Sequence, residues 1–151
     1  MTELSRTRRT RSGEPQNLPR PTDETDEVTV ETTWGTVQPL QPVPGIRTLG
    51  ELEVTELVRG GAQLVDTRVP DSRSGVSLPG AVNIPHDQVL LRRDELDTGR
   101  VHILFCNGPQ CPQTPDALRA LSRDGYPLDG LAYYRGGMHD WITLAMPTEQ
   151  V

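Results

Sequence analysis

The sequence predicts an α/β fold, with a central parallel sheet covered by helices on both faces. In residues 45–151, short apolar segments alternate with segments whose apolar residues recur at helical spacing. Two of the apolar segments end directly in chemically useful residues, Asp66 and Cys106. The carboxyl ends of parallel strands are where α/β proteins place their chemistry, so both residues fit strands of such a sheet.

Residues 1–44 are expected to be a disordered or extended arm, and residues 45–151 a single folded domain. Residues 1–27 are rich first in arginine and then in acidic residues, without apolar periodicity. Residues 28–37 carry β-branched side chains in loose alternation, which favours a short strand or an extended segment. Prolines then interrupt regular structure as far as Gly45. We treat this arm as a candidate docking segment for a protein partner.

The first predicted element of the domain is a helix over residues 48–61. Leu49, Leu52, Leu57 and Val58 fall at helix-compatible spacings, and two glycines end the segment. The later elements are expected, in chain order, to be strands at 62–66 and 82–84, a helix at 89–97, a strand at 101–105, a helix at 114–124, a strand at 131–134 and a helix at 138–144.

Composition narrows the class of protein. A chain of 151 residues, 34% hydrophobic and 24% charged, suits one domain with an unfolded extension. No apolar run is long enough for a bilayer, and no hydrophobic segment follows the charged amino terminus, so we expect a cytoplasmic protein. A net charge of -6 gives no reason to expect nucleic-acid binding. Two cysteines do not make a disulfide scaffold, and they fit a reducing compartment.

Cys106 is the candidate nucleophile. It follows the apolar run at residues 101–105 and lies just before the predicted helix at residues 114–124. Only the thiolate of a cysteine reacts, and a helix amino terminus can lower the thiol pKa. The alternative is that Cys106 is a small buried residue that ends a strand.

The candidate substrate-binding loop is Asn107, Gly108, Pro109, Gln110 and Cys111. The glycine lets the backbone curl and the proline restricts it, so that amide N–H groups can converge on an anion.

Four features together resemble the rhodanese-like domain family. They are the motif LVDTR at residues 64–68, the motif LPGAVNIP at residues 78–85, the strand leading into Cys106, and YRGG at residues 134–137 followed by Trp141. Their order and separation resemble that family over about residues 46 to 147.

The resemblance implies a single-domain sulfurtransferase. In such a protein the cysteine at position 106 takes a sulfane sulfur from a donor such as thiosulfate and becomes a persulfide. It then passes the sulfur to cyanide or to a thiol acceptor, without a cofactor or a metal. We interpret Asp66 and Arg68 as a structural pair that holds the strand end, in preference to a catalytic role.

The loop departs from the family pattern at Cys111, where many active members carry an arginine. Cys111 is either a neutral loop residue or a resolving thiol that closes a disulfide with Cys106. A zinc site is not expected, because the cysteines are spaced too far apart and the histidines are scattered. A cysteine phosphatase is also disfavoured, since Pro112 stands where the phosphate-binding arginine would be. The alternative to an enzyme is a non-catalytic or redox-regulatory binding module of the same fold.

Overall fold

The computed structural model describes residues 20–21, 28–29 and 37–151. Its centre is a five-stranded sheet in the order β3-β8-β7-β4-β6, in which every neighbouring pair is parallel. The strands are β3 (Arg47–Thr48), β8 (Leu131–Tyr134), β7 (His102–Phe105), β4 (Gln63–Asp66) and β6 (Val82–Asn83).

Strand β7 lies in the middle of the sheet, and all four of its residues are buried. Phe105, its last residue, is paired with Asp66 at the end of β4 and with Tyr134 at the end of β8. Three strands therefore end in register. The residues that follow them emerge together at one edge of the sheet.

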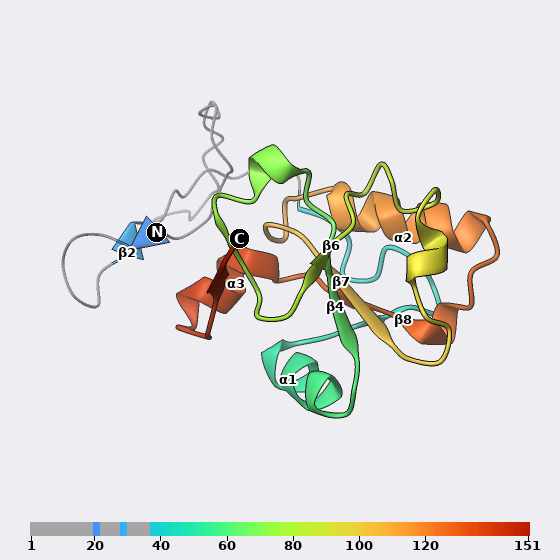
Figure 1. Cartoon of the computed structure of the whole chain (residues 1–151), viewed down its shortest axis with the longest axis horizontal. Coiled ribbons are helices and arrows are strands. Elements are labelled where there is room, and N and C mark those ends of the chain that lie inside the picture. Colours follow the sequence, from blue (N-terminus) through green and yellow to red (C-terminus); the bar gives the residue numbers. More distant parts are fainter. Residues whose placement is uncertain (1–19, 22–27, 30–36) are drawn as a thin grey trace, which may run out of the picture.

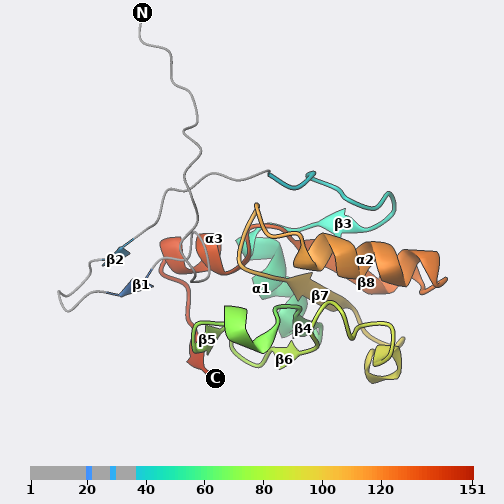
Figure 2. The same ribbon diagram turned by 90° about the horizontal axis from the view of Figure 1, so that it is seen from above.

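Helices cover both faces of the sheet (Figures 1 and 2). On one face, α2 (Gln113–Arg123) packs Leu118 and Leu121 into a cluster with Leu104 of β7. On the other, α1 (Glu51–Arg59) and α3 (Gly137–Thr143) pack against a cluster that contains Ile103. Adjacent strand residues point to opposite faces, so neighbouring side chains of β7 serve two separate cores.

Most of the predicted elements are present. The strands predicted at 62–66, 82–84, 101–105 and 131–134 correspond to β4, β6, β7 and β8, and the helices predicted at 48–61, 114–124 and 138–144 correspond to α1, α2 and α3.

Two details of the helix predictions are wrong. The first helix begins at Glu51 because Thr48 belongs to β3, and its buried contact is Val54 while Leu52 is 79% exposed. Residues 89–97 form turns and the short 3-10 helix η2 (Arg93–Glu95) in place of an α-helix. Val89 and Leu96 both reach the core, but from separate turns, so their apolar spacing imitates a helix.

Short elements that the sequence did not predict complete the fold. β5 (Val76–Ser77) pairs antiparallel with β9 (Glu149–Gln150), which places the carboxyl end of the chain beside β5 (Figure 2). The others are η1 (Pro70–Ser72), η3 (Leu128–Gly130) and β1 (Arg20–Pro21), which pairs antiparallel with β2 (Val28–Thr29). β2 itself lies in the segment at 28–37 for which the sequence favours a short strand or an extended segment. The predicted arm at 1–44 falls largely outside the described residues; within its described part, Val43 is buried in the core.

Candidate functional site

Cys106 is the first residue after β7, at the carboxyl edge of the sheet, and is only 2% exposed. The loop from Asn107 to Cys111 connects it to α2, so the sequence-predicted loop residues do lie together. The carbonyl of Cys106 accepts a hydrogen bond from the Met138 N–H at 3.0 Å, and the carbonyl of Asn107 accepts one from the His139 N–H at 2.8 Å. The start of α3 therefore holds the start of the loop.

Gly137 allows this close approach. A Cβ atom at this position would lie 2.3 Å from the Cys106 carbonyl oxygen and 2.8 Å from the Gly108 nitrogen. Its φ of 59° also lies in the left-handed region. Glycine is thus required at residue 137 for two independent reasons, and the second glycine of the YRGG motif has a structural role at the cysteine loop.

Asp66 and Arg68 form a fully buried ion pair beside the loop. The Arg68 Nε donates to Asp66 Oδ1 at 2.9 Å, and Nη2 donates to Asp66 Oδ2 at 2.7 Å. The Ser77 hydroxyl and the Arg73 Nε also donate to Oδ2, at 2.8 and 3.3 Å. Such a bidentate, fully hydrogen-bonded pair is the arrangement in which buried charges are tolerated.

Arg68 also contacts the loop. Its Nη1 donates to the Asn107 Oδ1 at 3.1 Å and to the Arg73 carbonyl, while Nη2 donates to the Val76 carbonyl. Together with the two bonds to Asp66, these contacts use all five N–H donors of the guanidinium. Arg68 therefore positions Asn107 and contributes a nearby positive charge, but it has no donor left for a bound anion.

Two threonines that the sequence analysis missed lie behind Cys106. The Thr67 hydroxyl donates to the Phe105 carbonyl at 3.0 Å and lies 2.7 Å from the Thr114 hydroxyl. The amide and hydroxyl of Thr114 each lower the pKa of Cys106 through hydrogen bonds. The sequence feature that could have pointed to Thr114 is its place in the first turn of the helix after the loop. Backbone N–H groups in a first turn have no partner within the helix.

Burial nevertheless raises the pKa of Cys106 well above its ordinary value, and the neighbouring Cys111 raises it further. Burial therefore outweighs the lowering of the pKa that the sequence predicts for the helix end. The amide and hydroxyl of Thr114 act in the expected direction, but a fully enclosed thiolate loses more hydration than they replace.

Cys111 shows the opposite behaviour. A hydrogen bond from the Cys106 thiol is the largest cause that lowers the Cys111 pKa, to about 7. The amides of Gln113 and Asn107 and the charge of Arg68 lower it as well, while burial raises it. The Cys106 Sγ also lies 3.6 Å from the Cys111 carbonyl oxygen. Of the two thiols in the loop, Cys111 is therefore the one that ionises more readily.

The outer side of the loop contacts the segment that precedes the first core strand. The N–H of Gln38 donates to the Pro109 carbonyl at 2.7 Å. Arg135 in turn donates from Nε and Nη2 to the Gln38 carbonyl, at 3.1 and 2.7 Å. Within the loop, the Cys111 N–H donates to the Gly108 carbonyl at 3.0 Å and closes a turn.

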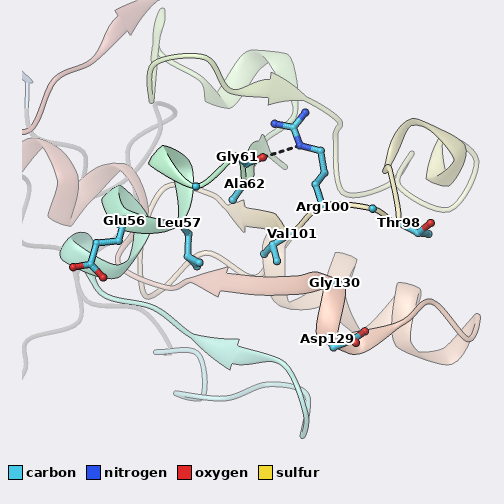
Figure 3. Close-up of a pocket in the computed structure, with 11 residues that line it drawn as sticks. Glu56, Leu57, Gly61, Ala62, Thr98, Arg100, Val101, Asp129 and Gly130 are labelled. Carbon is cyan, nitrogen blue, oxygen red and sulfur yellow. Dashed lines mark hydrogen bonds between the residues drawn. The ribbon is translucent and has the colours of Figure 1, made fainter.

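A hollow of about 400 Å³ lies at the opposite edge of the sheet (Figure 3). It is lined by residues that precede the strands, among them Ala62, Val101 and Gly130, and Arg100 donates there to the Gly61 carbonyl at 2.9 Å. Because it faces the amino ends of the strands, it is separate from the cysteine loop.

Two further findings concern the part of the chain that the structure describes. No group of three or more histidine, cysteine, aspartate or glutamate side chains is arranged to hold a metal ion there. Among the helices of the same residues, none has the length and apolar character needed to cross a bilayer.

The family model for the rhodanese-like domain matches residues 52–144. This chain belongs to the rhodanese-like domain family. The match spans β4, β6, β7 and β8 of the sheet, the Asp66 and Arg68 pair, the loop and the whole of α3.

Solved structures with the rhodanese fold agree with this assignment. A thiosulfate sulfurtransferase from Pseudomonas aeruginosa is 26% identical with a TM-score of 0.57, covering 70% of this chain and 20% of that one. A rhodanese-related protein from Thermoplasma volcanium is 19% identical with a TM-score of 0.58, covering 68% of this chain and 97% of its own, and supports the fold alone.

A curated relative resembles this rhodanese-like chain in sequence. It is an HTH-type transcriptional regulator from Mycobacterium tuberculosis, 31% identical over 91 residues. The match covers 60% of this chain but only 39% of the regulator.

Proposed function

We propose that the protein is a sulfurtransferase that carries a sulfane sulfur on Cys106. The observation that carries the proposal is the position of Cys106 at the end of the central strand, where the amide and hydroxyl of Thr114 form hydrogen bonds to its sulfur. These donors would stabilise both a thiolate and a persulfide anion at the same place.

Cys111 supplies the base for the first step. Its thiolate accepts a hydrogen bond from the Cys106 thiol and can take that proton as Cys106 attacks. With thiosulfate as donor, the Cys106 sulfur forms a bond to the outer sulfur, the S–S bond of thiosulfate breaks, and sulfite leaves with the electron pair. Cys106 then carries the sulfane sulfur as a persulfide.

The acceptor that completes the cycle is cyanide or a thiol, which takes the outer sulfur and returns Cys106 to the thiol form. We propose a cytoplasmic setting, because the reducing thiol pool there keeps both cysteines free, as they are in the structure. A protein that binds the arm at residues 1–44 is the further partner we propose.

The test measures sulfite release from thiosulfate by the reduced protein. The parent and Cys111→Ser are each expected to release one equivalent per chain, Cys111→Ser more slowly because its base is gone. Cys106→Ser should release none, because a hydroxyl is a far poorer nucleophile than a thiolate. Equal release by Cys106→Ser, or none by the parent, would refute the carrier role of Cys106 with this donor.

The second candidate is a regulatory binding module. It is favoured by the complete use of the Arg68 donors inside the fold, which leaves no arginine N–H from that residue for an anionic donor. The similarity to part of a transcriptional regulator points the same way. Absence of sulfite release with a normally folded parent would favour this candidate.

A further inference from the structure

We propose that Cys111 resolves the persulfide on Cys106, so that the loop reduces the sulfane sulfur and releases it as hydrosulfide while a Cys106–Cys111 disulfide forms. The inference rests on the proposed function, because it needs a sulfur on Cys106. It adds a second activity, persulfide reduction, to sulfur transfer.

The loop geometry brings the two side chains together. The turn closed by the Cys111 N–H and the Gly108 carbonyl folds the end of the loop back on its start. The Cys106 Sγ lies 3.6 Å from the Cys111 carbonyl oxygen, and the Cys106 side chain is the group that most lowers the pKa of Cys111. Cys111 is the more exposed of the two.

The charge distribution makes Cys111 the attacking group. Amides of Asn107 and Gln113 and the charge of Arg68 favour its thiolate, and its pKa of about 7 leaves a large ionised fraction at neutral pH. A thiol whose pKa is near the ambient pH is the best attacking thiol, since it combines ionisation with nucleophilicity. Asn107 and Gln113 therefore stabilise the sulfur that attacks, whereas Thr114 stabilises the sulfur that carries.

The step balances without an added oxidant. The Cys111 thiolate forms a bond to the Cys106 Sγ, the bond from that Sγ to the sulfane sulfur breaks, and hydrosulfide leaves with the electron pair. Two cysteine sulfurs are oxidised to a disulfide, and one sulfane sulfur is reduced to sulfide. A dithiol reductant of the cytoplasmic type then returns the loop to two thiols.

The burial of Cys106 decides which sulfur is attacked. Attack on the outer sulfur would expel Cys106 as a thiolate, and burial makes that thiolate a poor leaving group. Attack on the Cys106 Sγ expels hydrosulfide, a small anion, and leaves no thiolate on Cys106. The same enclosure that hinders ionisation of Cys106 therefore directs the reaction towards sulfide release.

The experiment follows the fate of the sulfur in oxygen-free buffer. Reduced parent and Cys111→Ser proteins are treated with one equivalent of thiosulfate, and separately with inorganic tetrasulfide, then desalted. Intact mass and released sulfide are measured over time. Cys111→Ser is expected to keep one extra sulfur. The parent should end two hydrogens lighter than the reduced protein and release one equivalent of sulfide, with a Cys106–Cys111 crosslink found by peptide mapping.

Samples without donor control for oxidation by air and must stay reduced. A parent that keeps its extra sulfur as long as Cys111→Ser would overturn the inference, as would transfer of that sulfur to Cys111. If thiosulfate does not load Cys106 but tetrasulfide does, the result counts against the proposed function. The protein loaded by tetrasulfide then still tests whether Cys111 resolves the persulfide. If tetrasulfide loads neither protein at Cys106, the inference fails because Cys106 cannot hold a sulfur.

Discussion

Cys106 and Cys111 belong to one short loop, yet their surroundings favour opposite protonation states. Burial keeps the proton on Cys106, whereas the Cys106 thiol, two loop amides and Arg68 favour the thiolate of Cys111. The first proton that the pair loses is therefore the one on Cys111. The sequence alone left the role of Cys111 open, because Arg68 and the Asn107 amide approach it only after folding.

Alkylation by iodoacetamide should report this pairing. In the parent, the rate of Cys111 alkylation is expected to rise with pH, with a midpoint near 7, since only the thiolate reacts. Cys106→Ala removes the largest cause of the lowered Cys111 pKa. In this variant the midpoint for Cys111 alkylation should move up towards the ordinary value of about 8.5.

Cys106→Ser is the matched control for this measurement, because its hydroxyl can still donate to Cys111. Its midpoint should stay closer to that of the parent than to that of Cys106→Ala. If both variants shift equally, the hydrogen bond from residue 106 is not what stabilises the Cys111 thiolate.

At the scale of elements, the loop is held between the start of α3 and the end of β7. The Met138 and His139 amides donate to consecutive loop carbonyls, and this contact exists only because residue 137 has no side chain. The family resemblance pointed to the YRGG motif from sequence. The reason for its second glycine could not be predicted, because it depends on a contact between segments thirty residues apart.

Gly137→Ala is expected to destabilise the protein more than Gly125→Ala. Both glycines have positive φ, of 59° and 79°, so each substitution carries a backbone cost of about 1–2 kcal/mol. A Cβ at Gly125 meets nothing within 4 Å, whereas one at Gly137 overlaps the Cys106 carbonyl, which adds about 1–3 kcal/mol of overpacking. Urea unfolding measures the difference in unfolding free energy.

The same two variants distinguish an effect on stability from an effect on the cysteine loop. Gly137→Ala should also lower sulfite release in conditions where it remains folded, because the loop must move, and Gly125→Ala should not. Equal losses of stability in the two variants would mean that α3 can shift away from Cys106 without cost.

For the molecule as a whole, β7 joins two cores that lie on opposite faces of one sheet. Its alternating side chains fill both, as the apolar run before Cys106 predicted. The strands of the sheet core were predictable for that reason: β7 and β8 are mostly apolar, and β4 carries Leu64 and Val65 at its centre. The turns at 89–97 were not, since Val89 and Leu96 imitate helical spacing while packing from separate turns.

Ile103→Ala and Leu104→Ala should each lower the free energy of unfolding by about 2–5 kcal/mol, because each side chain is fully buried in one of the two cores. Leu52→Ala is the control. Its side chain is 79% exposed, so its effect should stay within about 0.5 kcal/mol. A small loss for only one of the strand variants would show that the two cores contribute unequally, and chemical denaturation measures all three.

The contact between Gln38 and the loop has a mechanical consequence. The backbone of residue 38 is bonded on one side to Pro109 and on the other to Arg135, which follows β8 directly. A force on the chain ahead of residue 37 would therefore act, through Gln38, on the backbone of the loop that carries both thiols. A displacement of Gln38 would break its hydrogen bond to Pro109, which lies between the two cysteines in the chain.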